Sequence, residues 1–259
     1  MNINNQLKFL FDIGKEKPNS INNKNILCPF CHRECLTDIL DENGPFILVK
    51  NKYPTLENTL QTVLIETNNC NDNMSTYDKE YMRKLIQFGV NHWLSLKETG
   101  EFKSVIFYKN HGPHSGGTIN HSHMQIVGLK DIDYEEFLRD EFFEGITINK
   151  SKGCILNLST KPRVGFTEFN IIIDTINDLP IMADNLQKII HYILNNFYTK
   201  CDSFNLFFYE WRNHIVCKII PRFVTSPLFI GFSISQISNH MDMIVRKVQQ
   251  LYFNDNSTK

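Results

Sequence analysis

The stretch Lys109–Leu129, KNHGPHSGGTINHSHMQIVGL, places a turn of small residues directly before an alternation of two histidines and a glutamine. On a β-strand, side chains two positions apart lie on the same face. His121, His123 and Gln125 would therefore share one face, and the residues between them would take the other. Glycines let a backbone approach a ligand closely and turn its N–H groups toward it. Two imidazoles beside such an anion cradle indicate phosphate chemistry.

The composition of the whole chain is that of an ordinary globular protein. Its 259 residues are 42% hydrophobic, which is enough to bury one large core or two small ones. The formal net charge of -1 gives no basic field of the kind that holds nucleic-acid backbones, so we expect a small-molecule partner and no nucleic acid. The segment Met1–Ser20 carries charges among its apolar residues, which predicts neither a signal peptide nor a membrane span. We therefore expect a cytoplasmic protein that does not bind membranes.

The first half of the chain has the pattern strand, strand, helix, strand, strand, after a loosely attached start that ends at about Asn25. In Tyr77–Thr99 the apolar residues recur with a period of 3.6, which predicts a helix. Ser75 or Thr76 can cap its start, and Gly100 can end it. The clustering of β-branched and aromatic residues between Pro, Asn and Gly predicts four strands, at Phe46–Asn51, Gln61–Glu66, Ser104–Asn110 and His123–Leu129.

The second half repeats this order weakly, without the glycine turn and without the two histidines. Two similar halves, of which only the first is reactive, would produce such a pattern. The predicted elements are a strand at Val164–Asp174, a helix at Ile181–Tyr198, a hairpin of Ser203–Trp211 and His214–Ile220, and a final helix at Ser235–Phe253.

The chain has seven cysteines, two of which form the Cys28-x-x-Cys31 pair. An odd number with one such pair fits a reduced compartment with a metal or a free thiol better than a disulfide framework. Cys154, Cys201 and Cys217 are interpreted as small core residues. The pair itself supplies half of the four ligands that a structural zinc requires, and a thiol redox role is the alternative.

Five separated elements of the chain resemble, in the same order, those of the galactose-1-phosphate uridylyltransferase branch of the histidine-triad superfamily. They are Cys28–Cys31, Asn51–Pro54, Asn110–Gly112, Gly116–Thr118 and His121–Gln125. The resemblance covers about Ile26 to Leu129 and is nearest to an uncharacterised bacterial family within that branch. The rest of the chain is similar only in the order of its elements.

The resemblance implies an α+β fold of two histidine-triad-like halves, each an antiparallel sheet with a packed helix. We expect an N-terminal extension at residues 1–25, a catalytic half with a zinc site at 26–150, and a degenerate second half at 151–259. Relatives of this kind are often dimers, so a homodimer is possible, although no apolar stripe in the sequence identifies an interface.

The resemblance also implies that His123 attacks the α-phosphorus of a nucleotide and forms a covalent nucleotidyl-histidine. A neutral imidazole nitrogen is nucleophilic near pH 7. Gln125 stands where triad hydrolases carry a third histidine, and its amide can donate to a phosphate oxygen but cannot act as an acid, which favours transfer over hydrolysis. The predicted nucleotide- and phosphate-binding residues are Asn110, Gly116, Gly117 and Thr118.

For the metal, the first histidine of the motif is a zinc ligand in the resembling enzymes, which gives His121. A histidine shortly after the second strand is another, and that position falls on Cys70. A thiolate is an equally good zinc ligand, and Cys35 or His32 could replace Cys70. The predicted structural zinc site is Cys28, Cys31, Cys70 and His121.

Three functions remain after this comparison. The first is a ping-pong nucleotidyltransferase that takes a nucleotide sugar or a related nucleoside diphosphate compound, with a phosphorylated acceptor. The second is a nucleotide phosphorylase or hydrolase, and the third is a zinc-stabilised nucleotide-binding or sensor protein without turnover. One departure is Ser122, where uridylyltransferases often have proline. Lys218 and Arg222 could bind the acceptor or lie on a solvated strand face.

Overall fold

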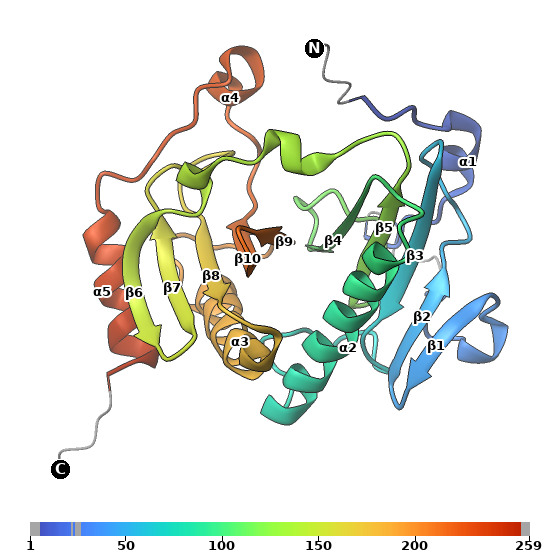
Figure 1. Ribbon diagram of the computed structural model, residues 1–259, viewed down its shortest axis with the longest axis horizontal. Helices are drawn as coiled ribbons and strands as arrows, with labels where there is room; N and C mark the ends of the chain where they lie inside the picture. The colour runs from blue at the N-terminus through green and yellow to red at the C-terminus, as the bar shows by residue number, and fades with distance from the viewer. Residues whose placement is uncertain (1–5, 22, 24–26, 255–259) are drawn as a thin grey trace. The chain divides into compact units, whose positions relative to one another are not determined.

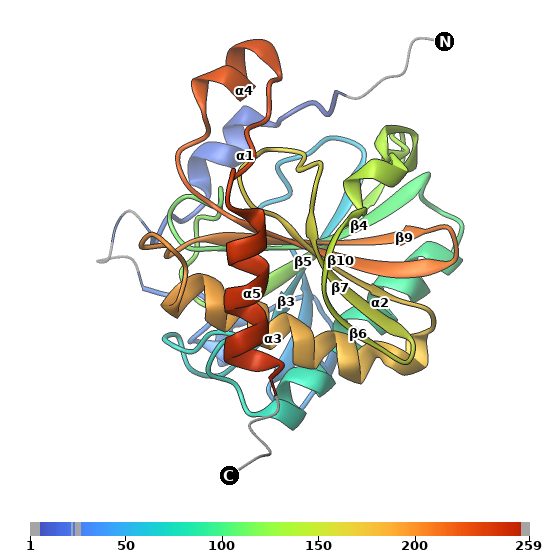
Figure 2. The same cartoon turned by 90° about the vertical axis from the view of Figure 1, so that its left-hand side faces the viewer.

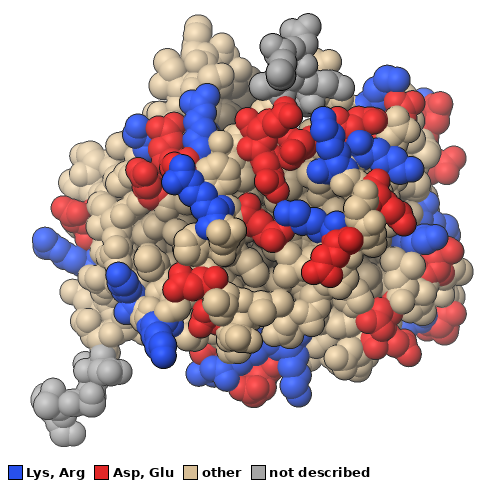
Figure 3. All heavy atoms as spheres, in the orientation of Figure 1, with Lys and Arg blue, Asp and Glu red and all other residues tan. Residues whose placement is uncertain are grey.

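The computed structural model describes residues 6–21, 23 and 27–254. The chain divides into two compact units, Met1–Leu138 and Arg139–Lys259 (Figure 1). Each unit is an antiparallel sheet with a packed helix, which confirms the predicted α+β class and the two-half architecture. No helix among the described residues has the length and apolar character needed to cross a bilayer. On the face drawn in Figure 3, acidic and basic side chains are interspersed.

In the first unit the paired order of the described strands is β1-β2-β3-β5-β4. Their bounds are β1 Ile39–Asn43, β2 Phe46–Lys50, β3 Thr59–Ile65, β4 Ser104–His111 and β5 His123–Leu129. The unit also holds the short helices α1 Phe11–Glu16, η1 Arg33–Cys35 and η2 Tyr134–Phe137. The four strands predicted from the sequence are confirmed to within two residues at each end, whereas β1, exposed along its whole length, had no apolar pattern to reveal it.

Helix α2, Lys79–Glu98, covers one face of this sheet. The carboxylate of Asp78 accepts hydrogen bonds from the N–H groups of Glu80 and Tyr81. The helix therefore begins after Asp78, and the predicted caps Ser75 and Thr76 are wrong. Its buried residues include Leu85, Ile86, Val90 and Trp93, the apolar positions that the period of 3.6 identified.

The strand register decides which side chains face α2. Ile65 pairs with His123 and Val63 with Gln125, so these four side chains share one face of the sheet. Phe107, on the other face, packs beside Trp93 of α2 with ring centroids 6.2 Å apart. His123 and Gln125 consequently lie on the face that α2 leaves uncovered, as their spacing predicted.

The N-terminal segment Lys8–Ile21, here called the strap, is attached at both ends to the rest of the first unit. The N–H of Leu10 donates to Thr55 O (2.8 Å), and the N–H of Ile21 donates to Thr118 O (3.2 Å). The prediction of a loosely attached start is therefore wrong for the described residues, because backbone hydrogen bonds to distant loops leave no pattern in the segment itself. Residues 1–5, 22, 24 and 25 of the predicted extension lie outside the described residues.

In the second unit the paired order of the described strands is β9-β10-β8-β7-β6. Their bounds are β6 Gly145–Ser151, β7 Cys154–Ser159, β8 Phe169–Ile173, β9 Phe204–Trp211 and β10 His214–Pro221. The helices are η3 Asp140–Phe142, η4 Ile176–Asp178, α3 Leu179–Asn195, α4 Pro227–Phe232 and α5 Met241–Tyr252. Figure 2 shows α3 and α5, which pack on each other, with α5 also against β6.

The order of elements in the second unit repeats that of the first. Three strands, a helix and two further strands follow each other along the chain, and they pair in the corresponding order. The weak repeat in the sequence thus corresponds to a repeated topology. The predicted boundary after residue 150 falls at the end of β6, a strand that pairs with β7 and belongs to the second unit.

Candidate active site

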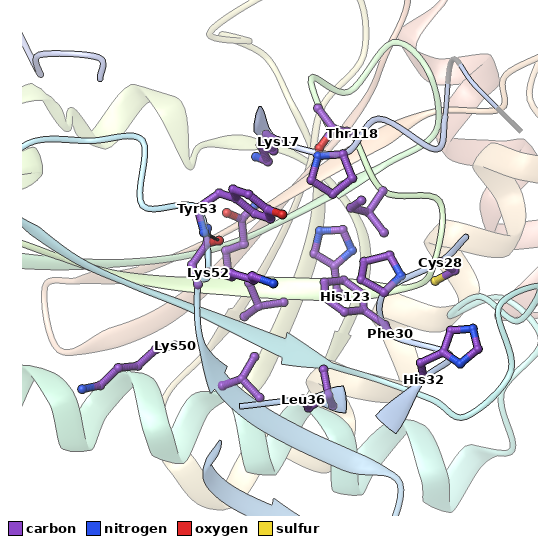
Figure 4. A pocket seen from close by; sticks show the side chains of 18 of the residues that line it. Lys17, Cys28, Phe30, His32, Leu36, Lys50, Lys52, Tyr53, Thr118 and His123 are labelled. Carbon is purple, nitrogen blue, oxygen red and sulfur yellow. Dashed lines mark hydrogen bonds between the residues drawn. The ribbon is translucent and has the colours of Figure 1, made fainter. Parts of the chain in front are cut away.

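A cavity of about 360 Å³ opens on the face of the first-unit sheet that α2 leaves uncovered (Figure 4). One wall is the segment 27–37, which carries Cys28, Cys31 and Cys35 and is here called the cysteine loop. The other walls are the end of β2 with the loop that follows, the turn before β5, and β5 itself. The structure brings together at this cavity all six residues that the sequence predicted for catalysis and phosphate binding: Asn110, Gly116, Gly117, Thr118, His123 and Gln125.

The imidazole of His123 is held in one orientation at the cavity. Its Nδ1 lies 2.7 Å from the carbonyl oxygen of His121, and because a carbonyl only accepts, Nδ1 carries the hydrogen. This leaves Nε2 unprotonated. Burial, followed by the positive charges of Lys109 and Lys17, lowers the pKa of His123 to about 3, so that the ring is neutral. A neutral, oriented imidazole has the form that a nucleophile requires.

The turn before β5 owes its shape to small residues. Gly116 has φ of +85°, a left-handed conformation that favours glycine. A Cβ on Gly117 would lie 3.2 Å from the Cβ of Asn110, which is tighter than ordinary contact. The N–H of Gly117 donates to Ser115 Oγ (3.3 Å), so this N–H closes the turn. The Thr118 hydroxyl is shielded from solvent and has no hydrogen-bond partner among the described residues.

Cys28, Cys31, Cys70 and His121 form a cluster whose four candidate ligand atoms all lie within 4.8 Å of one another. The Sγ atoms of Cys28 and Cys31 are each 3.5 Å from His121 Nδ1. Ligands on a tetrahedral zinc, with bonds of about 2.0 to 2.3 Å, lie about 3.5 to 3.8 Å apart. The Nε2 of His121 lies 2.8 Å from the Thr67 carbonyl, which places the hydrogen on Nε2 and leaves Nδ1 to face the sulfurs.

The acid–base chemistry of the cluster also fits a cation. Although burial opposes ionisation of Cys28, hydrogen bonds with His121 and with the Phe30 backbone lower the pKa of that thiol to about 6. Burial and the charge of Cys28 raise the pKa of Cys70 to about 12. A divalent cation would remove this mutual repulsion and hold all the thiols as thiolates. The cluster is thus a candidate metal site, and the alternatives Cys35 and His32 lie outside it, in the cavity wall.

Phe30 joins the cysteine loop to both histidines. Its ring packs edge-on against His121, with centroids 5.9 Å apart, and against His123, with centroids 5.4 Å apart. The candidate metal cluster and the candidate nucleophile therefore share one packing contact.

A buried ion pair lies behind the strand that carries His123. Lys109 and Glu66, both without solvent exposure, form a short salt bridge. The Lys109 ammonium also donates to Ser122 Oγ (3.0 Å) and to the carbonyl of His123 (3.2 Å), and Ser122 Oγ donates to Glu66 (3.0 Å). A buried charge requires such partners. The network fixes the backbone of the two-histidine segment from the α2 side.

Sequence reasoning missed this network, although a lysine inside an otherwise buried strand was a usable signal. It also left Lys218 as a candidate for binding an acceptor. That interpretation is wrong, since Lys218 has no solvent exposure and its ammonium is 3.0 Å from Glu168. Cys154, Cys201 and Cys217 are buried, as predicted.

Comparison with known proteins gives the same fold. A crystal structure of a DUF4931 family protein from Bacillus cereus is 47% identical and has a TM-score of 0.77, over 84% of this chain and 100% of that one. An ADP-glucose phosphorylase from Arabidopsis thaliana, solved with bound ADP-glucose, has a TM-score of 0.67 at 13% identity and covers 92% and 93%. A uridylyltransferase has a TM-score of 0.69 at 12% identity and covers 87% and 91%. A search of curated proteins gave no match.

The fold is thus that of the uridylyltransferase-like branch that the sequence motifs indicated. Residues 9–132 match the N-terminal domain, and residues 135–253 the C-terminal domain, of the domain of unknown function DUF4931. The chain belongs to the DUF4931 family.

Proposed function

We propose that the protein transfers nucleotidyl groups through a covalent intermediate on His123. The observation that carries the proposal is the 2.7 Å contact of Nδ1 with the His121 carbonyl in a ring that lines a cavity. Since Nδ1 is the protonated nitrogen, Nε2 is the one with a lone pair for phosphorus. Attack of Nε2 on the α-phosphorus forms a P–N bond, and the bond from that phosphorus to the leaving oxygen breaks.

The other cavity residues have supporting roles in this proposal. Gln125, two positions along β5 on the same face, donates its amide N–H to a phosphoryl oxygen. The Thr118 hydroxyl, which has no hydrogen-bond partner in the described part of the chain, donates to another phosphoryl oxygen. Asn110 contacts the phosphates or the ribose, and the open space beside Gly116 admits the ligand close to the backbone.

Cys28, Cys31, Cys70 and His121 would hold a structural zinc. The ion would tie the cysteine loop to the residue that precedes β5 by two positions, and so brace the carbonyl that orients His123.

The substrate we propose is a nucleotide sugar or a related nucleoside diphosphate compound. The folds of an ADP-glucose phosphorylase and of a uridylyltransferase, and a cavity large enough for a nucleotide, support this choice. Transfer to a phosphorylated acceptor and phosphorolysis share the first half-reaction, so both belong to the proposal. A nucleotide sensor without turnover has no need of an oriented nucleophile.

Intact-mass spectrometry tests the proposal. The protein is incubated with UDP-glucose, ADP-glucose and a dinucleoside polyphosphate, without an acceptor, and the mass of the chain is read. We expect an added nucleotidyl group that is lost in His123→Ala and kept in the control His111→Ala. Adduct formation by His123→Ala, or loss of the adduct only in His111→Ala, would reject His123 as the nucleophile. Absence of any adduct or turnover in the wild-type protein would favour the sensor.

A further inference from the structure

The strap carries a cation into the wall of the cavity. Lys17 is half-buried at the cavity rim, one residue beyond the end of α1. Hydrogen bonds from the N–H of Ile21 to Thr118 O (3.2 Å) and from the N–H of Asn120 to Ser20 Oγ (3.0 Å) fix the strap on the turn that precedes β5. Lys17 is therefore held beside the residues proposed to bind phosphate.

A second cation reaches the same cavity from another segment of the chain, the loop after β2. Lys52 follows β2, and its side chain extends toward His123 in Figure 4, while Lys17 lies beside Tyr53 at the rim. Lys50, two residues earlier, points away from the cavity centre. Two ammonium groups from separate segments thus converge on one space, and a third lysine of the same rim does not.

The positive charge of this cavity is not compensated within the described residues. No aspartate or glutamate is among the residues that line it, and Lys17 and Lys52 have no carboxylate within ion-pair distance in the described part of the chain. Burial alone lowers the pKa of Lys17. Keeping an ammonium half-buried without a partner costs free energy, and an anionic ligand would offset that cost.

We propose that Lys17 and Lys52 form a binding site for a phosphate dianion, and that this site holds the acceptor which discharges nucleotidyl-His123. The acceptor role rests on the proposed function. An oxygen of inorganic phosphate or of a phosphate monoester attacks the phosphorus, a P–O bond forms, and the P–N bond breaks. Its electron pair returns to Nε2. The dianion needs no general base, which agrees with a cavity whose lining includes no carboxylate among the described residues.

Two half-reaction measurements test the assignment. The nucleotidyl-enzyme is prepared, freed of small molecules, and mixed with inorganic phosphate, with glucose 1-phosphate or with buffer alone, and loss of the adduct is followed by mass. We expect Lys17→Met to slow discharge by the phosphate compounds by about tenfold to hundredfold, the loss typical of one charged hydrogen bond. Discharge by water, which does not use the dianion site, should slow less than discharge by the phosphate compounds. Whichever phosphate compound discharges the adduct faster identifies the source of the dianion.

Matched variants separate position from charge. Lys52→Met should act in the same direction as Lys17→Met, and Lys17→Arg should restore most of the rate. Lys50→Met removes an identical charge from the same rim and should leave discharge unchanged. An equal loss of discharge rate in Lys50→Met and Lys17→Met would overturn the assignment, because it would mean that the overall positive charge of the rim, and not a site at Lys17 and Lys52, attracts the dianion.

Calorimetric titration of the unloaded protein with inorganic phosphate and glucose 1-phosphate tests the site without the intermediate. Binding should weaken about tenfold or more in Lys17→Met and be unaffected in Lys50→Met. Unchanged binding in Lys17→Met would overturn the assignment whether or not an adduct forms. If wild-type protein binds phosphate through Lys17 but never forms an adduct, the anion site stands, and the proposed transfer and the acceptor role fail.

Discussion

The two units share one topology, but their buried lysine–glutamate pairs lie on opposite faces of the sheets with respect to the covering helix. In the first unit the buried pair of Glu66 and Lys109 lies on the α2 side of the sheet. Lys109 is two positions after Phe107 on β4, so it shares the face on which Phe107 packs beside α2. The other face is left for the cavity with His123 and Gln125.

In the second unit the buried ion pair lies on the face turned away from the covering helix. The amide of Asn185 in α3 donates to Cys154, so Cys154 and its strand partner Ile173 face α3. Ile215 pairs with Ile173 and faces α3 as well. Lys218, three positions after Ile215 on β10, therefore faces away from α3. There Lys218 meets Glu168 at 3.0 Å, and its ammonium lies 5.9 Å from the ring centre of Phe143.

The comparison teaches what turns such a face into a site. In the second unit the lysine on this face is paired with Glu168, whereas the first unit places an oriented imidazole, a hydroxyl without a partner among the described residues and two lysines at an open cavity. A ligand can bind only where the protein has not already neutralised its own polar groups. The two units therefore differ in how their charged groups are paired and not in their topology.

The strongest test of this comparison replaces, one at a time, the two histidines that occupy equivalent positions in the two units. His123 is the first residue of β5, and His214 is the first residue of β10. We expect His123→Asn to lower the transfer rate by at least about 10³-fold, because the nucleophile is lost. The matched variant His214→Asn should keep the wild-type rate. Initial rates with a nucleotide sugar and a phosphate acceptor measure both, and a comparable loss in the two variants would contradict an inert second unit.

The buried ion pairs provide the next largest effect. Lys109→Met and Lys218→Met each leave a buried carboxylate without its partner, which should cost about 3 to 5 kcal/mol in the free energy of unfolding. The double variants Glu66→Gln/Lys109→Met and Glu168→Gln/Lys218→Met should recover most of that loss, as urea denaturation would show.

The rate of adduct formation should distinguish the Glu66–Lys109 pair from the Glu168–Lys218 pair. The double variant at Lys109 should also slow adduct formation, since that ammonium donates to the carbonyl of His123, while the double variant at Lys218 should not. Full activity in both would show that the network behind β5 has no positioning role.

Metal removal tests whether only the first unit depends on the cluster. We expect about one zinc per chain by elemental analysis, and its chelation should destabilise the first unit by about 3 to 4 kcal/mol. Cys70→Ala should lower the metal content, and Cys35→Ala, outside the cluster, should not. Amide hydrogen exchange should increase in β5 and stay constant in β10. A full metal load in Cys70→Ala would remove that residue from the ligand set.

The smallest expected effect concerns the turns. Gly116→Ala forces alanine to a φ of +85° in open space and should cost about 1 to 2 kcal/mol. Gly153→Ala, in the second unit, meets the same kind of strain at +75°, and its Cβ would lie 2.5 Å from Asp178 Oδ1, so its cost should be larger. Thermal unfolding of both variants measures the difference, and a greater loss for Gly116→Ala would show that its turn is packed more tightly than described.

The sequence was enough to predict which residues of the candidate site lie close together. His121, His123 and Gln125 are neighbours in the chain, so the alternation of a strand is enough to place them on one face. The cysteine pair was found from its spacing and Cys70 through the resemblance, and the structure brings all three cysteines to His121.

The missed features depend on tertiary contacts. Strand β6, Gly145–Ser151, alternates apolar residues only at Ile146 and Ile148 before an irregular register, so its apolar pattern is too short to predict a strand, and pairing with β7 stabilises it. The second-unit strand begins at Phe169 and not at Val164, because the Val164 N–H donates to the carboxylate of Glu168 in a loop. The strap, Glu66 and Lys109 were hidden for the same reason, since their partners lie 40 to 100 positions away.

One hydrogen bond described above has a consequence for the nucleophile. The peptide oxygen of His121, a candidate metal ligand, selects which tautomer His123 adopts, two residues along the chain. If that peptide rotated, the proton of His123 would no longer be fixed on Nδ1. A proton on Nε2 would remove the lone pair that the proposed attack on phosphorus requires.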